Sequence, residues 1–431
     1  MLSTLIVLVN IVMGVQLSGE LGWNLSFVGI SDFHRDSIVC LPGPVGVGVV
    51  RWDIEPSQDA VVKFGLRVMD FRYQSALSTP DPGMLSSVYV DEMVLYLYDF
   101  ALEGLDIGIG KQRVGWGCAD FMSVIDNINP ILAVPGGISS GMDYLGVYSI
   151  VVDYTLPLDI EVQSLFLPFF ASLGVTQDVM DWGFSKAFSD ASMPFNIRDV
   201  DVEFVPPERF SDGIGGGVRL GKTILDVDVY LSYLNHVDPV PYTRRRDIYE
   251  DGTIDVEFGY HREEVFGVEM GSVLWDIGIR GEAAYFVPEV AVCTTVVRMQ
   301  AGVFRRTEYC AGSPYWKFTL GADYDFGDGW YANAEFIRGI IGERMEYVLR
   351  NYGFLVLRKE WNEKWQTTAT MLTDFGEEFD FKGIIGGVGV DYKVCDDVDL
   401  MANVMAIEGD SAKWAVMDGE VMLGFGMKVA F

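Results

Sequence analysis

The chain has 431 residues, of which 50% are hydrophobic and 13% aromatic, and its formal net charge is −31 at pH 7. This negative charge argues against nucleic acid and anionic membrane surfaces as partners, because both would repel the chain. A membrane-spanning helix needs about 20 consecutive apolar residues, and beyond the N-terminus charged residues, Ser, Pro or Gly interrupt every apolar stretch sooner. High hydropathy without such stretches is typical of a membrane β-barrel.

The N-terminus carries an apolar core from Leu5 to Val15, followed by the small residues Ser18 and Gly19. This arrangement resembles a secretory signal peptide, although no Lys or Arg precedes the core. We therefore expect residues 1–19 to be a signal peptide and residues 20–431 an outer-membrane β-barrel. The alternative is that the apolar core is a short buried strand.

Strict alternation of apolar and polar residues begins at 61–73, where Val62 and Phe64 oppose Lys63. Similar segments recur along the chain and place charges on one parity of many strands. A dry sandwich core would not tolerate these charges unpaired, whereas a hydrated barrel interior would. The expected lumen charges are Lys63, Arg67, Asp226, Asp228, Arg280, Glu282, Lys317, Asp323, Glu335 and Lys428.

The predicted fold is all-β, a transmembrane antiparallel barrel of about 16–18 strands with short periplasmic turns and long extracellular loops. The count depends on whether residues 352–357 form a strand. The long polar loops are expected at 173–212, 236–261 and 288–313.

The segment 109–130 departs from the alternation, because a strand runs into a glycine-rich break and then a loop. Together with residues 90–98, it resembles the G-[KR]-Q-x-x-x-W-G-x-x-D … D-x-x-N-P stretch of porin-like families that include uncharacterised barrels and alginate-export-like channels. The resemblance covers about forty residues. It implies a loop that reaches toward the lumen, with constriction candidates at Lys111, Gln112, Arg113, Trp116, Asp120, Asp126 and Asn129. The alternative is a fold-determining turn that never contacts solute.

The last eleven residues alternate strictly from Val421 to an aromatic terminus, Phe431. Such a strand suits a lipid-facing position at the end of a barrel. The ending also resembles the C-terminal signal that the β-barrel assembly machinery of bacteria recognises, which makes Phe431 the candidate assembly signal. The alternative is an ordinary sandwich strand.

Five cysteines are scattered without a C-x-x-C pair or a histidine at metal-ligand spacing, so no metal or other cofactor is expected. Two of them fall within one predicted loop and could form a disulfide in an oxidising compartment, and the odd count leaves at least one thiol free. The five are Cys40, Cys118, Cys293, Cys310 and Cys395, with Cys293 and Cys310 the possible pair.

The three histidines, His34, His236 and His261, lie in or beside predicted loops, and no hydrolase signature accompanies them, so no enzymatic activity is expected. The glycine cluster 213–217 is not followed by a helix pattern. We interpret it as a site of close packing rather than as a phosphate loop.

These patterns predict a porin-like channel of the bacterial outer membrane through which small hydrophilic solutes diffuse. Its expected partners are membrane lipid, lipopolysaccharide-type lipids, the assembly machinery and the solutes. Two alternatives remain: a barrel for hydrophobic compounds, similar to long-chain fatty-acid transporters, and a structural or adhesive surface barrel. The sequence leaves the oligomeric state open.

Overall fold

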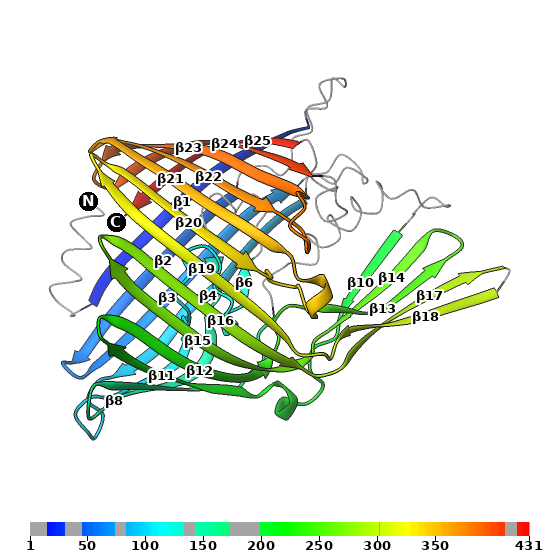
Figure 1. Cartoon of the computed structure of the whole chain (residues 1–431), viewed down its shortest axis with the longest axis horizontal. Coiled ribbons are helices and arrows are strands. Elements are labelled where there is room, and N and C mark those ends of the chain that lie inside the picture. Colours follow the sequence, from blue (N-terminus) through cyan, green and yellow to red (C-terminus); the bar gives the residue numbers. More distant parts are fainter. Residues whose placement is uncertain are drawn as a thin grey trace.

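The computed structural model describes residues 15–30, 45–73, 83–132, 143–172, 199–300, 302–409 and 420–430. Eighteen strands form one sheet that curves into a barrel (Figure 1). Their bounds are β1 Val15–Ile30, β2 Val45–Ser57, β3 Ala60–Tyr73, β4 Gly83–Leu97, β5 Leu105–Gln112, β8 Val147–Leu156, β9 Ile160–Leu167, β11 Gly215–Ile224, β12 Val227–Val237, β15 Arg262–Leu274, β16 Ile277–Pro288, β19 Tyr315–Gly327, β20 Trp330–Arg338, β21 Asn351–Asn362, β22 Trp365–Asp374, β23 Gly383–Cys395, β24 Val398–Gly409 and β25 Glu420–Ala430.

All pairings within this sheet are antiparallel and follow the chain order of its strands. The first strand pairs with β2 and also with β25, where Glu20 lies opposite Ala430. Every strand of the sheet therefore has a neighbour on both sides. The predicted antiparallel barrel is confirmed, with eighteen strands, because residues 352–357 belong to β21.

Some residues named in the sequence predictions lie outside the described part of the chain. These are residues 1–14 of the expected signal peptide, most of the 173–212 loop, His34, Cys40 and the terminal Phe431. Residues 15–19 form the start of β1, and Val15 pairs with Ile54. The structure thus includes in the barrel five residues that the sequence assigns to the signal peptide.

Short turns join the strands at one end of the barrel. Two of them are two-residue turns with positive φ at both positions, Leu225 and Asp226 (51° and 64°) and Trp275 and Asp276 (52° and 66°). This geometry matches the right-handed twist of the paired strands. Asp226 therefore lies in an exposed turn, and its predicted place on the lumen wall is wrong because the chain reverses at this position.

Five further strands form a second sheet at the opposite end, where the long connections lie (Figure 1). In sheet order they are β10 Asp199–Phe204, β14 Thr253–Gly259, β13 Tyr242–Tyr249, β17 Ala291–Met299 and β18 Gly302–Ala311. The pairs β10–β14 and β13–β17 are parallel. The prediction of loops at 236–261 and 288–313 is thus wrong in part, because alternating apolar residues such as Ile254, Val256 and Phe258 form a buried cluster there.

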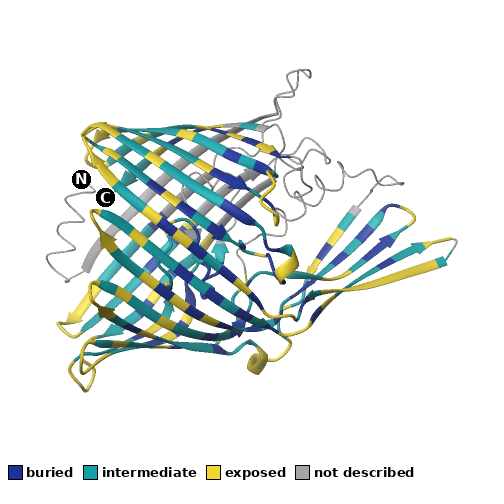
Figure 2. Cartoon of the chain, viewed as in Figure 1, coloured by how far each residue is buried: buried dark blue, intermediate teal, exposed yellow. Residues whose placement is uncertain are grey.

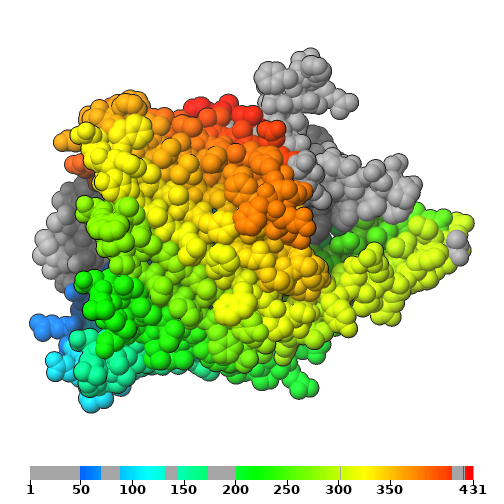
Figure 3. Space-filling view, viewed as in Figure 1, coloured from blue at the N-terminus to red at the C-terminus, as the bar shows by residue number. Residues whose placement is uncertain are grey.

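The barrel strands expose apolar side chains on their outer face and bury polar ones on their inner face. Leu220, Leu231 and Val268 lie side by side on three neighbouring strands, and all are exposed. Figure 2 shows the alternation of exposed and buried residues along the strands, and Figure 3 shows one side of the outer wall that the strands form. Other exposed apolar residues of the barrel strands are Val68, Ile109, Ile150, Phe166, Ile279, Leu320, Met371, Val388, Val404 and Phe425.

This distribution is the reverse of a water-soluble domain, where large exposed apolar surfaces are rare. Among the described residues, no helix is both long and apolar enough to cross a membrane.

Candidate functional site

Residues 113–130 form a loop that crosses the interior of the barrel. The loop leaves β5 and is followed by β6 (Ile131–Leu132), which pairs with β7 (Asp143–Tyr144). It contacts β16, β20 and β21, which are six, eight and nine strands away from β5 around the eighteen-stranded sheet. Since nine strands are half of eighteen, the loop reaches the far wall.

Two buried carboxylates on that wall hold the loop backbone. Glu282 of β16 accepts hydrogen bonds from the N–H groups of Val124 at 2.5 Å and Cys118 at 2.9 Å. Glu335 of β20 accepts hydrogen bonds from the N–H groups of Asp120 at 2.6 Å and Phe121 at 3.2 Å. Loop N–H groups inside a barrel have no strand partner, so these carboxylates supply acceptors that the loop itself lacks.

Aromatic packing adds to these anchors. The ring of Phe121 stacks on Phe354 of β21 with 3.8 Å between centroids. Trp116 is 2% exposed, and its indole Nε1 donates a hydrogen bond to Gln163 at 2.5 Å. A Cβ atom at Gly217 would lie 2.8 Å from the Trp116 ring. The glycine at this position therefore makes room for the indole, which is the close packing expected of the cluster 213–217.

Asn129 holds the base of the loop together. Its side-chain amide donates to the carbonyl of Val114 at 2.6 Å, and its oxygen accepts from the Val114 N–H at 3.1 Å. The same amide reaches the Asp126 carboxylate at 3.2 Å. Burial raises the pKa of the Asp126 carboxyl to about 7, although the Asn129 hydrogen bond opposes the shift. Asp126 therefore changes its charge near neutral pH.

Asp120 links the loop to the charged wall beneath it. Its carboxylate forms an ion pair with Arg280 at 2.7 Å and accepts a hydrogen bond from Asn333. Arg280 also pairs with Asp323 of β19. The Asp120 carboxylate of the loop is thus part of a polar network whose other members lie on the far wall, on β16, β19 and β20.

A basic cluster lies on the opposite wall. Asp91 of β4 is buried and accepts a hydrogen bond from Arg67 at 2.9 Å and one from Arg113 at 3.2 Å, and Arg51 lies 3.6 Å away. Three guanidinium groups around one carboxylate leave an excess of positive charge. β3, which carries Arg67, is nine strands from β19, which carries Asp323. Basic and acidic groups therefore face each other across the lumen.

Two predicted constriction residues lie in the barrel wall instead. Gln112 is buried, and its amide donates to Ser149 at 3.1 Å. Lys111 pairs in register with Met93 and Tyr148, both of which are exposed on the outer face. The prediction that Lys111 lies near the constriction is therefore wrong.

The glycine before Lys111 explains the difference in part. Gly110 has φ +140°, and its position lies so close to β4 that a Cβ atom would be 2.1 Å from the Met93 carbonyl oxygen. The Lys111 ammonium donates a hydrogen bond to the Val90 carbonyl at 2.6 Å. This bond gives the charged group a polar partner beside the apolar outer surface.

The remaining lumen candidates have structural partners or lie at the barrel end. The Lys63 ammonium lies 5.6 Å from the Tyr96 ring centre, and the buried Lys317 donates to the Ile340 carbonyl at 2.9 Å. Asp228 is exposed next to the turn and accepts from Thr223 at 2.6 Å. Lys428 is half-buried in β25.

Several charged residues of the barrel interior were not predicted from the sequence. Asp91 and Arg51 complete the basic cluster, and Arg219 forms a bidentate pair with Glu269 at 3.0 and 2.6 Å. Arg51 lies in register with Gly65, two positions from Arg67. Arg67 faces inward, so Gly65 and the residue opposite it on β2 face inward too. This pairing is the signal that could have identified Arg51.

No family model matches the chain, and no curated protein matches it. Among solved structures, a triple mutant of the Rh. blastica porin is 13% identical, with a TM-score of 0.39 over 97% of this chain and 100% of that chain. OmpT, an outer membrane protein of Vibrio cholerae in its trimer form, is 12% identical, with a TM-score of 0.42 over 97% of this chain and 99% of that chain. Likeness at this level carries no argument, and the proposals below rest on the geometry of this chain.

Proposed function

We propose that this protein is a channel of the bacterial outer membrane through which small hydrophilic solutes diffuse. The observation that carries the proposal is the loop 113–130, which crosses the barrel interior and is held at the far wall by Glu282 and Glu335. A loop in this position narrows the space that a solute can use. The exposed apolar outer face and the polar inner face support a membrane location.

The charge arrangement supports selection of solutes by charge and shape. The arginines around Asp91 and the carboxylates around Arg280 lie on opposite walls. Charges of opposite sign across a narrow aqueous path produce a transverse field, which orders water and favours solutes that align with it. The resemblance of residues 109–130 to porin-like and alginate-export-like channels supports the same class of function.

One observation favours a second candidate, the passage of hydrophobic or amphipathic compounds. Leu372, Ile385 and Ile407 lie on the inner face of β22, β23 and β24 and pack with Met122 of the loop. An apolar strip inside a barrel offers a surface to apolar solutes. In the described structure Phe121 packs against the same strip, which makes this the weaker candidate.

A liposome-swelling assay separates the two candidates. The refolded full chain is placed in vesicles, which are then diluted into neutral sugars of increasing size. A hydrophilic channel predicts fast swelling with small sugars and a sharp decline with larger ones. Vesicles that do not swell with any sugar would contradict the channel proposal, and saturable uptake of an apolar dye by the same vesicles would support the second candidate.

A further inference from the structure

Four polar side chains cluster at the mouth of the barrel, apart from the loop site. His236 and Asp238 lie at the end of β12, and His261 and Glu263 lie at the start of β15. His236 is in register with Glu263, and the Asp238 N–H donates to the His261 carbonyl at 2.9 Å. Residues two apart on a strand share a face, and opposite residues of paired strands lie close together. All four side chains therefore belong to one face.

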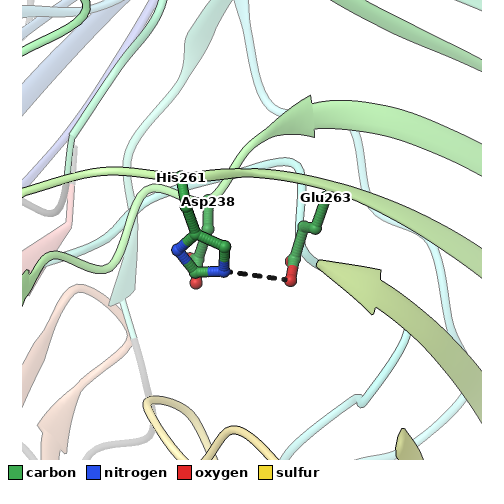
Figure 4. Close-up of side chains that lie close together, drawn as sticks. All are labelled: Asp238, His261 and Glu263. Carbon is green, nitrogen blue, oxygen red and sulfur yellow. Dashed lines mark ion pairs between the residues drawn. The ribbon is translucent and has the colours of Figure 1, made fainter. Parts of the chain in front are cut away.

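The donor atoms of this cluster converge (Figure 4). One atom each from Asp238, His261 and Glu263 lie within 4.8 Å of one another. His261 Nε2 is 3.8 Å from Glu263, and His236 Nε2 is 3.3 Å from the other oxygen of Glu263. A tetrahedral zinc site with bonds of about 2.1 Å places its ligand atoms roughly 3.4 Å apart. Small side-chain movements would bring these donors to that spacing.

The cluster also contains buried polar atoms without a hydrogen-bond partner. His261 is 5% exposed and Glu263 3% exposed. Among the described residues, neither ring nitrogen of His261 has a hydrogen-bond partner, nor do His236 Nε2 and Glu263 Oε2. Burying a polar group without a hydrogen-bond partner is energetically unfavourable, so several such atoms close together require an explanation. A shared ligand would satisfy them together.

Two cations lie beside the cluster and must be considered. Arg344 pairs with Asp238 and also donates to the Val240 carbonyl, and the Lys317 ammonium donates to Ile340. Arg344 occupies one oxygen of Asp238, as the outer partners of metal-bound carboxylates commonly do. Burial, followed by the charge of Arg344, lowers the pKa of the His261 imidazole.

We propose that Asp238, His261 and Glu263, with His236 as a fourth donor, bind one divalent transition-metal ion of the zinc class. Two imidazoles and two carboxylates suit Zn²⁺ better than Ca²⁺ or Mg²⁺, which prefer oxygen ligands alone. The ion would join the ends of β12 and β15 at the point where the chain passes into β13 and β14 of the second sheet. This inference does not depend on the proposed channel function.

Metal titration of the full-length refolded protein tests the proposal. After treatment with a chelator, the protein in detergent is titrated with Zn²⁺ by calorimetry and with Co²⁺ by visible absorption. We expect one ion per chain and the intense absorption of tetrahedral Co²⁺. His261→Ala and Glu263→Gln should each weaken Zn²⁺ binding at least tenfold. Asp228→Asn changes an exposed carboxylate at the other end of β12, next to the turn, and should leave the affinity unchanged.

Two outcomes would overturn the proposal. One is the absence of stoichiometric Zn²⁺ binding to the wild-type protein. The other is binding that both cluster variants retain at full strength. If a variant does not refold, as judged by circular dichroism, the wild-type Co²⁺ spectrum still decides, because weak octahedral absorption would contradict a tetrahedral site made of these four donors.

Discussion

Glu335 on β20 accepts a hydrogen bond from the backbone N–H of Asp120 at 2.6 Å, although the loop that carries Asp120 leaves the barrel wall at β5, eight strands away. This bond, together with those that Glu282 accepts, fixes the loop across the lumen. In the proposed channel, the barrel wall thus holds the loop that narrows the path.

Removing both anchors should release the loop. Hydrogen bonds to charged groups each contribute about 1.5–3 kcal/mol. The double variant Glu282→Ala and Glu335→Ala loses the hydrogen bonds that hold the loop backbone, while the strands should stay paired. We expect a higher single-channel conductance and noisier open-channel current. Glu269→Ala is the control, since it removes a lumen carboxylate that binds Arg219 and not the loop. Currents equal to those of the wild type in the double variant would show that the loop does not restrict the path.

The basic cluster should set the ion preference in a direction that depends on the residue changed. Arg113→Gln removes a positive charge beside Asp91 and should shift the reversal potential toward cation selectivity. Asp91→Asn removes the carboxylate that the three arginines share and should shift the reversal potential toward anion selectivity. The measurement is the zero-current potential in a salt gradient. If both variants shift the reversal potential in the same direction, or neither shifts it, the basic cluster does not line the ion path.

A methyl group at Gly217 should disturb the packing of the Trp116 indole ring. The added Cβ would lie 2.8 Å from the indole and 2.4 Å from the Tyr233 carbonyl oxygen. Overpacking of this kind costs about 1–3 kcal/mol, so Gly217→Ala should lower the folded fraction in a heat-modifiability gel assay. Gly386→Ala is the matched control, because a Cβ there meets no atom of the described residues within 4 Å. Equal folded fractions in the two variants would mean that the Trp116 ring does not pack against Gly217.

Asp126 should make the channel sensitive to pH. Its pKa is raised to about 7 by burial, so the carboxyl is neutral in acid and becomes charged as the pH rises through 7. Wild-type selectivity should therefore move toward cations across this pH, and Asp126→Asn should not show the change. The folded state holds a proton that the unfolded chain releases above about pH 4, so this residue lowers stability as the pH rises from about 4 to 7. Reversal potentials that depend on pH equally in both proteins would contradict this assignment.

Alternation of side chains was sufficient to predict the barrel, because lipid outside and water inside impose a period of two on every strand. The second sheet was not predicted, since its parallel pairs β10–β14 and β13–β17 join segments that are distant in the chain. A polar alternating segment outside a membrane resembles a loop until its partner strand is known.

The site was predictable only in its location along the chain. Resemblance indicated the segment 109–130, but Glu282 and Glu335 become its partners only when the sheet curves and brings β16 and β20 opposite β5. The outward position of Lys111 follows an irregular backbone at Gly110. Likewise, the pairs His236 with Asp238 and His261 with Glu263 look unrelated until strand register places them together.

Single-channel recording tests the central claim most directly. The refolded full-length protein is inserted into a planar bilayer with a salt gradient. The account predicts discrete conductance steps and a defined reversal potential in the wild type, with larger steps when Glu282 and Glu335 are both replaced by alanine. A protein that shows the circular dichroism of a folded β-barrel and inserts into the bilayer, yet never conducts in either form, would contradict the account.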